Sequence, residues 1–212
     1  MQILRERYDH AGGRLLDGSI VVTGGRCREG CRPSKPRDRI YCRGSFCFRF
    51  TEVLRPCRGS FVEGPPLNAG RQDPAYATVD GRLFVCGGLG RRGYLSSCES
   101  LSSADGQWRT LPQAMPYKLV FATAAGINGC LYVMGGQRWE NRRHNPRGYV
   151  NVTLRFENGN WTEMTSFGEA RADAAAAAVE IQGRWIIVLC GGKTLVLDEE
   201  WGSMQPRASR HV

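Results

Sequence analysis

The sequence predicts an all-β protein built from about four copies of one sheet-forming unit. Three observations favour this fold class. A hairpin turn, a short apolar run and a pair of glycines occur together four times along the 212 residues. The copies recur at roughly 50 residues, a spacing typical of repeat architectures. A tryptophan also follows each of the last three glycine pairs.

The clearest copy of the unit is residues 128–136. It opens with Asn-Gly, which favours a two-residue hairpin turn because both central residues need a positive φ. The run Cys-Leu-Tyr-Val-Met suits a buried strand and ends at Gly135 and Gly136. A glycine pair marks a sharp turn or a close approach to another backbone. The other copies end at Gly24 and Gly25, Gly87 and Gly88, and Gly191 and Gly192.

The third copy contains all four strands that we expect in a unit. They lie at residues 120–126, 130–134, 149–156 and 160–164. The segment 149–156 alternates with a period of two, as a half-buried strand does, and Asn158 with Gly159 favours a second hairpin turn. Four antiparallel strands joined by two tight hairpins and one long loop form the blade of a propeller.

The second and fourth copies follow the same order. The second has expected strands at 75–79, 82–88 and 97–103 and a short one beginning at Trp108. In the fourth copy we expect the first strand at 172–179 and the third at 193–198, with almost no loop between the glycine pair and that third strand.

The alanine run 174–178 tests this interpretation. Helix propensity alone favours a short helix there. We interpret the run as a strand, because small residues occupy the same place in the other copies, for example Ala75 and Ala124. The first strand of each blade lies nearest the propeller axis, where small side chains relieve crowding. A short helix is the alternative.

Trp108, Trp161 and Trp201 each begin the outermost strand of a copy. An aromatic side chain of this size buries a large apolar area, so we interpret the three as packing between neighbouring blades. Stacking on a sugar or contact with a partner is the alternative role.

These residues resemble the kelch repeat family. Lead-in arginines match at Arg71, Arg171 and Arg207, the glycine pairs match, and Phe156 with Trp161 matches the aromatic pair. The resemblance covers residues 70–212 well and 5–25 in part. It implies a kelch-type β-propeller. Because kelch propellers are usually six- or seven-bladed, about four blades predict an incomplete ring or a fragment.

The kelch pattern is absent from one segment, and we place the domain boundaries around it. After Gly25 the pattern is lost for some forty residues, through an irregular basic insertion or through loss of the outer strands of that blade. We expect a partial first kelch blade at 1–25, an irregular basic segment at 26–66, kelch blades at 67–115, 116–166 and 167–206, and the start of a further blade at 207–212.

The formal charge of +9 is concentrated in the segment 26–58. A basic chain can bind nucleic acid, but an excess confined to one irregular segment disfavours that partner. The longest apolar runs fall far short of the about 20 residues that a membrane helix needs. The N-terminus lacks a signal-peptide core. We therefore expect a cytoplasmic protein with no membrane partner.

The cysteines fall into two groups. Cys86, Cys98, Cys130 and Cys190 lie in predicted strands, where cysteine serves as a small core residue. Five others lie in the basic segment, and we expect them to be unpaired thiols. Zinc bound by four thiolates is the alternative for Cys27, Cys31, Cys42 and Cys47. No metal site or cofactor is predicted.

Candidate binding residues lie on loops, because a rigid scaffold presents its recognition residues there. The longest loop within a blade is 137–148, and its arginine and tryptophan are residue types that dominate binding energies. The predicted binding residues are Arg91, Arg92 and Tyr94 of the second blade and Arg138, Trp139, Arg142, Arg143 and His144 of the third. Solvated loop side chains are the alternative.

The resemblance implies a protein–protein interaction scaffold. Kelch-like proteins often recognise substrates for ubiquitin ligases, and others bind actin. Partner identity is open, and unpaired blade edges could also support self-association. A kelch-type enzyme, an oxidase or sugar isomerase, is an alternative, but His10, His144 and His211 are too scattered to predict a catalytic cluster.

Overall fold

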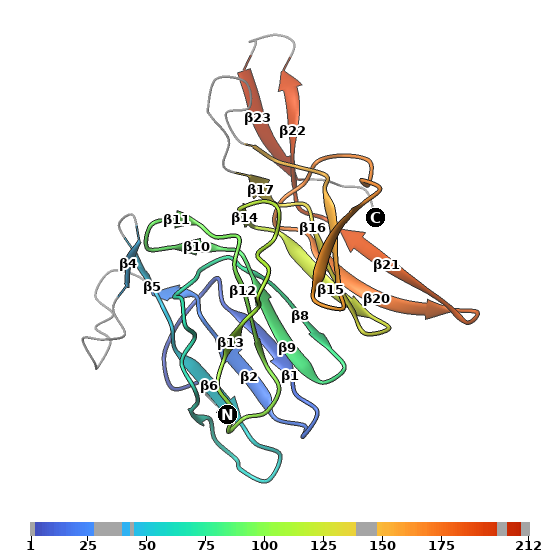
Figure 1. The fold of residues 1–212 in the computed structure, drawn as a ribbon. Coiled ribbons are helices and arrows are strands. Elements are labelled where there is room, and N and C mark those ends of the chain that lie inside the picture. The colour runs from blue at the N-terminus through green and yellow to red at the C-terminus, as the bar shows by residue number, and fades with distance from the viewer. Residues whose placement is uncertain (1–2, 28–39, 43–44, 139–147, 199–202, 209–212) are drawn as a thin grey trace.

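The structure, a computed structural model, describes residues 3–27, 40–42, 45–138, 148–198 and 203–208. These residues form strands and turns without a helix, so the described part of the chain has no helix long and apolar enough to cross a membrane. The strands form several small antiparallel sheets arranged side by side (Figure 1).

The first blade is a complete four-stranded sheet in the order β1-β2-β6-β7. Its strands are β1 (Ala11–Arg14), β2 (Ile20–Thr23), β6 (Thr51–Leu54) and β7 (Val62–Glu63). The outer two strands come from the segment predicted to be irregular, which is therefore part of the blade from Thr51 onward. The pattern was lost because an insertion separates β2 from β6.

The insertion forms a sheet of its own. β3 (Arg26–Cys27), β5 (Ser45–Cys47) and β4 (Ile40–Cys42) pair in that order. Of the two explanations that the sequence left open, an insertion within the first blade is the one that the strand order supports. The zinc alternative concerns cysteine side chains that lie outside the described ones.

The second blade has the order β13-β12-β9-β8. Its strands are β8 (Ala75–Val79), β9 (Arg82–Cys86), β12 (Cys98–Leu101) and β13 (Arg109–Thr110). A small hairpin of β10 (Leu89–Gly90) and β11 (Gly93–Tyr94) lies between the second and third strands of this blade.

The third blade has the order β15-β16-β18-β19, as predicted. Asn128 and Gly129 turn with φ of 49° and 74°, the left-handed values that a tight hairpin requires. Beside this sheet, two short strands, β14 and β17, also pair. The strands are β14 (Leu119–Val120), β15 (Thr123–Ile127), β16 (Cys130–Met134), β17 (Gln137–Arg138), β18 (Thr153–Glu157) and β19 (Asn160–Met164).

The fourth repeat begins as predicted and then departs from the pattern. The alanine run belongs to β20 (Ala175–Ile181), paired with β21 (Arg184–Cys190), so the strand interpretation is confirmed and the helix is wrong. Residues predicted as the third strand instead form β22 (Lys193–Asp198), which pairs with β23 (Ser203–Ala208).

The position of Lys193 explains this departure. Lys193 bridges Ala172, as Leu89 bridges Gln72 in the second blade. Leu89 begins the β10–β11 hairpin, so the β22–β23 hairpin holds the equivalent position in the fourth repeat and has longer strands. Trp201 lies outside the described residues.

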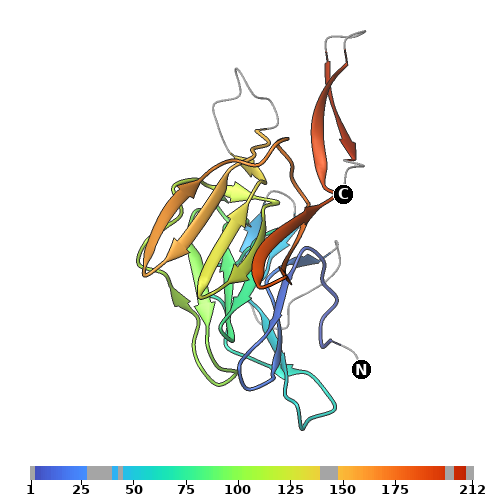
Figure 2. The same ribbon diagram turned by 90° about the vertical axis from the view of Figure 1, so that its right-hand side faces the viewer.

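The first strands of the four repeats, β1, β8, β15 and β20, lie next to one another in sequence order. The view in Figure 2 shows the sheets fanned around this inner row of strands. This is the arrangement of propeller blades, with the first strand of each blade innermost.

The glycine pairs occupy equivalent joints between blades. The N–H groups of Gly25, Gly88 and Gly136 donate to the carbonyls of Arg71, Leu119 and Arg171, at 2.9, 2.8 and 2.8 Å. Each of these carbonyls belongs to the lead-in residue of the next blade. At Gly88 φ is +88° and a Cβ would lie 2.6 Å from the Gln72 carbonyl oxygen, so only glycine fits.

Two tryptophans pack between blades, as predicted. Trp108 is buried in the core shared by blades one and two, and its Nε1–H donates to Thr51 Oγ1 and to the Pro65 carbonyl of blade one, both at 3.0 Å. Trp161 of blade three donates to the Gln113 carbonyl at 3.3 Å.

Cys86 and Cys98 form a disulfide, where the sequence suggested two separate core residues. Both are buried, as expected, and the register explains the bond because the two residues lie directly opposite each other on β9 and β12. Cys130 and Cys190 are free thiols.

Candidate binding face

The candidate site lies at the end of the blades where the second strands reach their glycine pairs. The β10–β11 hairpin and the β14–β17 pair lie at this end (Figure 1). Three of the predicted binding residues, Arg91, Arg92 and Tyr94, line a cavity of about 450 Å³ there. Lys118 and Phe121 of the third repeat complete its wall.

Arg138 lies beside this cavity. It is on β17, opposite Leu119 of β14. The residues on either side of Leu119, Lys118 and Val120, line the cavity. Its guanidinium carbon lies 4.0 Å from the ring centroid of Tyr117, a cation–π contact. The other predicted residues of this loop, Trp139, Arg142, Arg143 and His144, lie outside the described residues.

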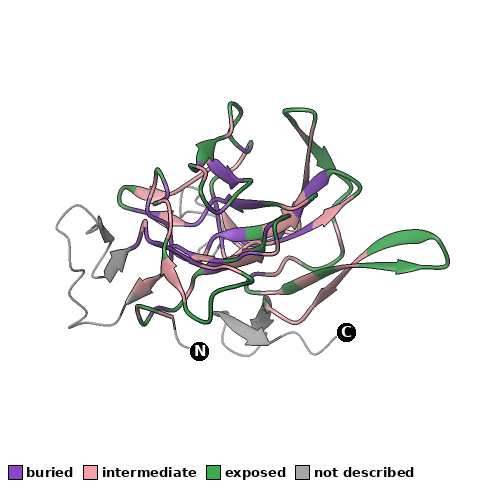
Figure 3. Cartoon of the chain, turned by 90° about the horizontal axis from the view of Figure 1, so that it is seen from below, coloured by how far each residue is buried: buried purple, intermediate pink, exposed green. Residues whose placement is uncertain are grey.

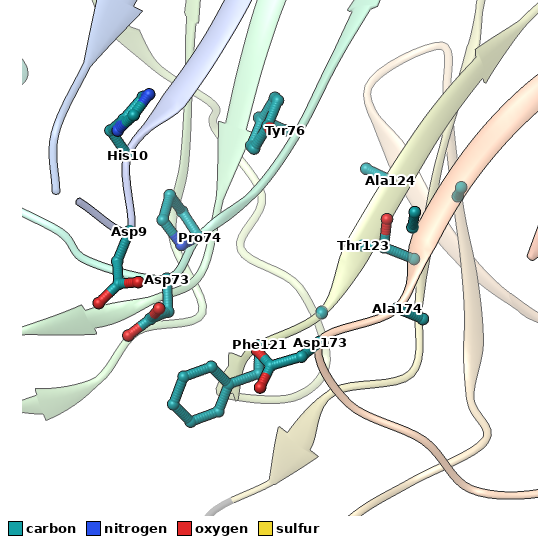
Figure 4. A pocket seen from close by; sticks show the side chains of 13 residues that line it. Asp9, His10, Asp73, Pro74, Tyr76, Phe121, Thr123, Ala124, Asp173 and Ala174 are labelled. Carbon is teal, nitrogen blue, oxygen red and sulfur yellow. The ribbon is translucent and has the colours of Figure 1, made fainter. Parts of the chain in front are cut away.

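A second set of residues, which the sequence analysis missed, lies nearer the propeller axis. Asp9, Asp73, Phe121 and Asp173 hold the same position in successive repeats, each with a left-handed φ between 50° and 58°. Each one from Asp73 onward donates its backbone N–H to the carbonyl of the one before, at 2.9–3.1 Å. Figure 4 shows their side chains together.

These residues line a cavity of about 360 Å³ with His10, Tyr76 and the alanines of β20. The usable sequence signal was an aspartate just before the first strand of a repeat, since Asp tolerates a left-handed φ better than other non-glycine residues. Phe121 breaks that pattern. A bulky residue in this conformation is strained, and Phe121 lines both cavities.

Two of the three aspartates are paired with basic side chains. Arg26 donates to Asp9 and Lys193 to Asp173, each at 2.6 Å. Burial and the neighbouring Asp9 carboxylate raise the pKa of Asp73 to about 7. Burial and nearby Arg7 lower the pKa of His10, so its imidazole is neutral at physiological pH.

The face therefore combines two electrostatic zones. Arginine and lysine with apolar side chains surround the outer cavity, whereas carboxyl groups surround the inner one. Such a surface can orient a ligand that carries an acidic group beside a cationic one. Among the side chains that the structure describes, no three His, Cys, Asp or Glu residues are grouped to hold a metal ion.

Residues 70–115, which include the whole second blade, match the Kelch motif family. The second blade therefore carries a kelch motif. The chain is 32% identical over 110 residues to the Caenorhabditis elegans spermatocyte protein spe-26, covering 50% of this chain and 19% of that protein. It is also 30% identical over 102 residues to Kelch-like protein 40 of Mus musculus, covering 48% and 15%.

The kelch propeller also resembles a solved structure, that of YjhT. The TM-score is 0.65 at 15% sequence identity, with 95% of this chain and 68% of that chain covered. At this identity the likeness concerns the fold alone, and together with the Kelch motif of residues 70–115 it confirms the all-β kelch-type propeller. The chain spans less than a fifth of the curated relatives that it matches.

Proposed function

We propose that this kelch propeller binds an acidic segment of another protein at the outer cavity of the glycine-pair face. The observation that carries the proposal is that loop residues of blade two and the start of the third repeat surround one cavity. Kelch repeats and kelch-like relatives support a protein-interaction scaffold in general. The acidic partner and the residues that bind it are our inference.

The chemistry of the cavity suits this ligand. Arg91, Arg92 and Lys118 supply three positive charges, and guanidinium groups bind carboxylates through paired hydrogen bonds. Leu89, Val120 and the strained Phe121 supply apolar surface for a side chain next to the acidic group. The carboxyl groups of the inner cavity repel a second acidic residue, which fixes the direction of the bound segment.

Recognition of a ubiquitin-ligase substrate is the form of this function that we favour, since the relatives include a kelch-like protein. Actin binding is the alternative within the same class. Both roles are proposals, because the chain covers a small part of those relatives. A cytoplasmic location belongs to the same proposal, although disulfides such as Cys86–Cys98 are rare in a reducing cytoplasm.

The proposal is tested by capture of partners from cell extract on the immobilised chain, followed by binding measurements with the purified partner. Changing Arg91 and Arg92 together to alanine should weaken binding by about tenfold to a hundredfold. Arg109→Ala is the matched control, since this exposed arginine lies on β13, away from the cavity. Equal loss in both variants would contradict the proposal.

One observation favours the enzyme alternative enough to test it. Asp73 titrates near neutral pH in a cavity beside Asp9, as a general acid or base must. We propose binding as the function, so Asp73→Asn should leave partner capture intact. Turnover of a sugar or alcohol substrate that is lost in Asp73→Asn would favour the enzyme instead.

A further inference from the structure

The second blade has a covalent link at the point where its second and third strands separate. Cys86 of β9 and Cys98 of β12 form a disulfide, and they are the last of the four residue pairs of this ladder on the glycine-pair side. In Figure 3 the buried residues lie at the centre of the molecule, whereas several hairpin tips are exposed. The disulfide belongs to the buried part, since the exposed fractions of Cys86 and Cys98 are 2% and 0%.

The loop that this disulfide closes carries the candidate binding residues of the second blade. Residues 87–97 lie between the two cysteines and contain the β10–β11 hairpin. Arg91, Arg92 and Tyr94 lie in this hairpin and line the outer cavity. A change at the base of the loop therefore acts on all three side chains together.

The β10–β11 hairpin has little pairing of its own. Its two residue pairs are Leu89 with Tyr94 and Gly90 with Gly93. A two-stranded hairpin by itself is marginally stable at best in water. The arginines at its tip are exposed and add little packing. The hairpin therefore depends on how firmly the body of the blade holds its two ends.

The backbone holds the equivalent ends in the same way in blades one, two and three. The first glycine of each pair donates its N–H across to the residues that lead into the third strand. These hydrogen bonds measure 2.9–3.0 Å and join Gly24 to Phe50, Gly87 to Ser97 and Gly135 to Val152. The backbone therefore does not distinguish the second blade from the other two.

The side chains at the last residue pair do differ. In blade one they are Thr23 and Thr51, whose hydroxyl oxygens lie 2.8 Å apart and share a hydrogen bond. In blade three they are Met134 and Thr153. Both blades fill this position without a covalent bond, so the blade fold does not require one there. The disulfide therefore points to a role that is specific to the second blade.

The physical effect of a bond at this position is on local opening. Strand pairs open most readily at the ends of a ladder and beside loops. A hydrogen bond between two hydroxyl groups breaks and re-forms during such opening, whereas a disulfide keeps the two strands together. A loop that is already held in its bound conformation loses less entropy on binding, so its affinity is higher.

We propose that the Cys86–Cys98 disulfide positions the β10–β11 hairpin for binding, so that the outer cavity holds an acidic segment tightly only while this bond is intact. This role rests on the proposed function, in which the cavity binds such a segment. The two cysteines are positioning residues, since they act through Arg91 and Arg92. Disulfides in a reducing cytoplasm are usually transient and often sense the redox state, so in that location the bond would control binding.

Reduction of the bond proceeds by exchange with a dithiol. One thiolate of the dithiol attacks a sulfur of the disulfide and forms a mixed disulfide, and the second thiol then closes the disulfide of the reductant. Both cysteines leave as thiols, and two electrons and two protons pass to the protein. Because both cysteines are buried, the attack requires the end of the ladder to open. A ligand that holds the hairpin closed should therefore protect the bond.

Hydrogen exchange of the full chain tests the positioning without a ligand. Reduction with dithiothreitol should speed amide exchange about tenfold in residues 87–97 and leave residues 75–79 of the same blade unchanged. Equal exchange in the two states would overturn the proposal. An equal increase at residues 75–79 would also overturn it, because the disulfide would then serve the stability of the whole blade.

A double variant controls for the action of dithiothreitol on other cysteines. Cys86→Thr with Cys98→Thr copies the hydrogen-bonded pair of blade one and fills the position without a bond. Its residues 87–97 should exchange as fast as in the reduced chain, with no further change on adding dithiothreitol. Slow exchange, as with the intact bond, would overturn the proposal. Should this variant fail to fold, the two states of the unchanged chain still decide.

Binding measurements connect the hairpin to the cavity. The probe is a labelled synthetic peptide, Gly-Gly-Glu-Leu-Gly-Gly, which has one acidic residue beside an apolar one. Fluorescence anisotropy should give an affinity about tenfold lower for the reduced chain and for the double threonine variant than for the intact chain. Cys57→Ser is the matched control, since Cys57 is a free and exposed cysteine, and it should bind as the original chain does.

The reduction potential gives a readout that a purely structural role would not move. Affinity and reduction are linked, so a tenfold preference for the intact form makes the bond tenfold harder to reduce when the peptide saturates the chain. This is a shift of about 30 mV, measured by counting free thiols in dithiothreitol redox buffers. An unchanged potential with the peptide bound would overturn the proposal.

The outcomes also separate this role from the proposed function. Equal binding of the peptide to all forms would overturn the role of the disulfide and leave the cavity as the binding site. Binding to none of them, while exchange in residues 87–97 still depends on the bond, would overturn the acidic ligand and confirm the positioning of the hairpin.

Discussion

The joints of blades two and three are filled by different kinds of side chain, a charged pair in blade two and an apolar pair in blade three. The lead-in residue and the third strand meet at the blade joint as Arg71 with Glu99 in blade two, and as Leu119 with Leu154 in blade three. All four side chains are almost completely buried. The backbone hydrogen bond from the preceding glycine pair is the same at both joints.

This comparison shows that the ion pair is not what holds the joint together. The backbone geometry and the filled volume are common to both blades, whereas the charges are present in one. Burying an ion pair costs desolvation that its attraction roughly offsets, so an apolar pair of similar size can replace it. What neither joint tolerates is one charge without the other.

The largest effect should come from breaking the polar joint on one side. Glu99→Leu leaves the Arg71 guanidinium buried without its carboxylate, and also removes the acceptor for the backbone N–H groups of Asn68 and Ala69. We expect a loss of about 3–5 kcal/mol in the free energy of unfolding, measured by urea titration.

Its control is the double variant Arg71→Leu with Glu99→Leu, which copies the joint of blade three. We expect it to recover part of the loss, with the remainder due to the two backbone N–H groups. A double variant that is less stable than Glu99→Leu would contradict the equivalence of the joints.

Placing a single charge in the apolar joint of blade three should lower the free energy of unfolding by somewhat less. Leu154→Glu buries a carboxyl group beside Leu119, and we expect a loss of about 2–4 kcal/mol at pH 8. The loss should shrink as the pH falls, because a buried carboxyl group becomes neutral by binding a proton. Adding Leu119→Arg should restore stability at pH 8, and no restoration would argue against a transferable joint.

The same two blades differ again near the axis, where blade two has Asp73 and blade three has Phe121. The pKa of Asp73 is raised to about 7, mainly by burial, from 3.8. The folded protein thus binds the proton more tightly than the unfolded chain, so this group lowers stability as the pH rises between about 4 and 7, and the penalty is complete above that range.

Asp73→Asn removes this penalty. We expect the variant to be about 1–2 kcal/mol more stable than the original chain at pH 8 and nearly equal to it at pH 4, a discounted figure because the carboxyl group is partly solvated. Thermal unfolding of both proteins across this pH range measures the difference. A constant difference would mean that Asp73 does not titrate there.

The smallest effect should come from Phe121. Its φ of 57° suits Asn or Asp far better than a bulky residue. Phe121→Asn should therefore raise the free energy of unfolding by up to about 1 kcal/mol. The gain is smaller by the packing energy that the phenyl ring contributes. If the strain serves the binding face, the same variant should bind the captured partner more weakly. A variant that gains stability and keeps full affinity would remove Phe121 from the site.

Local chemistry explains why much of the fold could be predicted. Asn128 and Gly129 determine a turn, the apolar runs determine strands, and the glycine pairs determine the joints, because each depends on residues adjacent in sequence. The place of Arg91 and Arg92 on a loop of the second blade could be predicted for the same reason, whereas their role in binding stays a prediction. The outer strands of the first blade could not be predicted in this way, because an insertion separates β2 from β6.

Only the tertiary structure decided how distant residues meet. The pairing of Arg71 with Glu99, the disulfide between Cys86 and Cys98, and the row of Asp9, Asp73 and Asp173 each join positions that the chain separates. By itself the sequence determined the repeated unit, since turn and strand preferences are local, whereas partners across blades follow from packing alone.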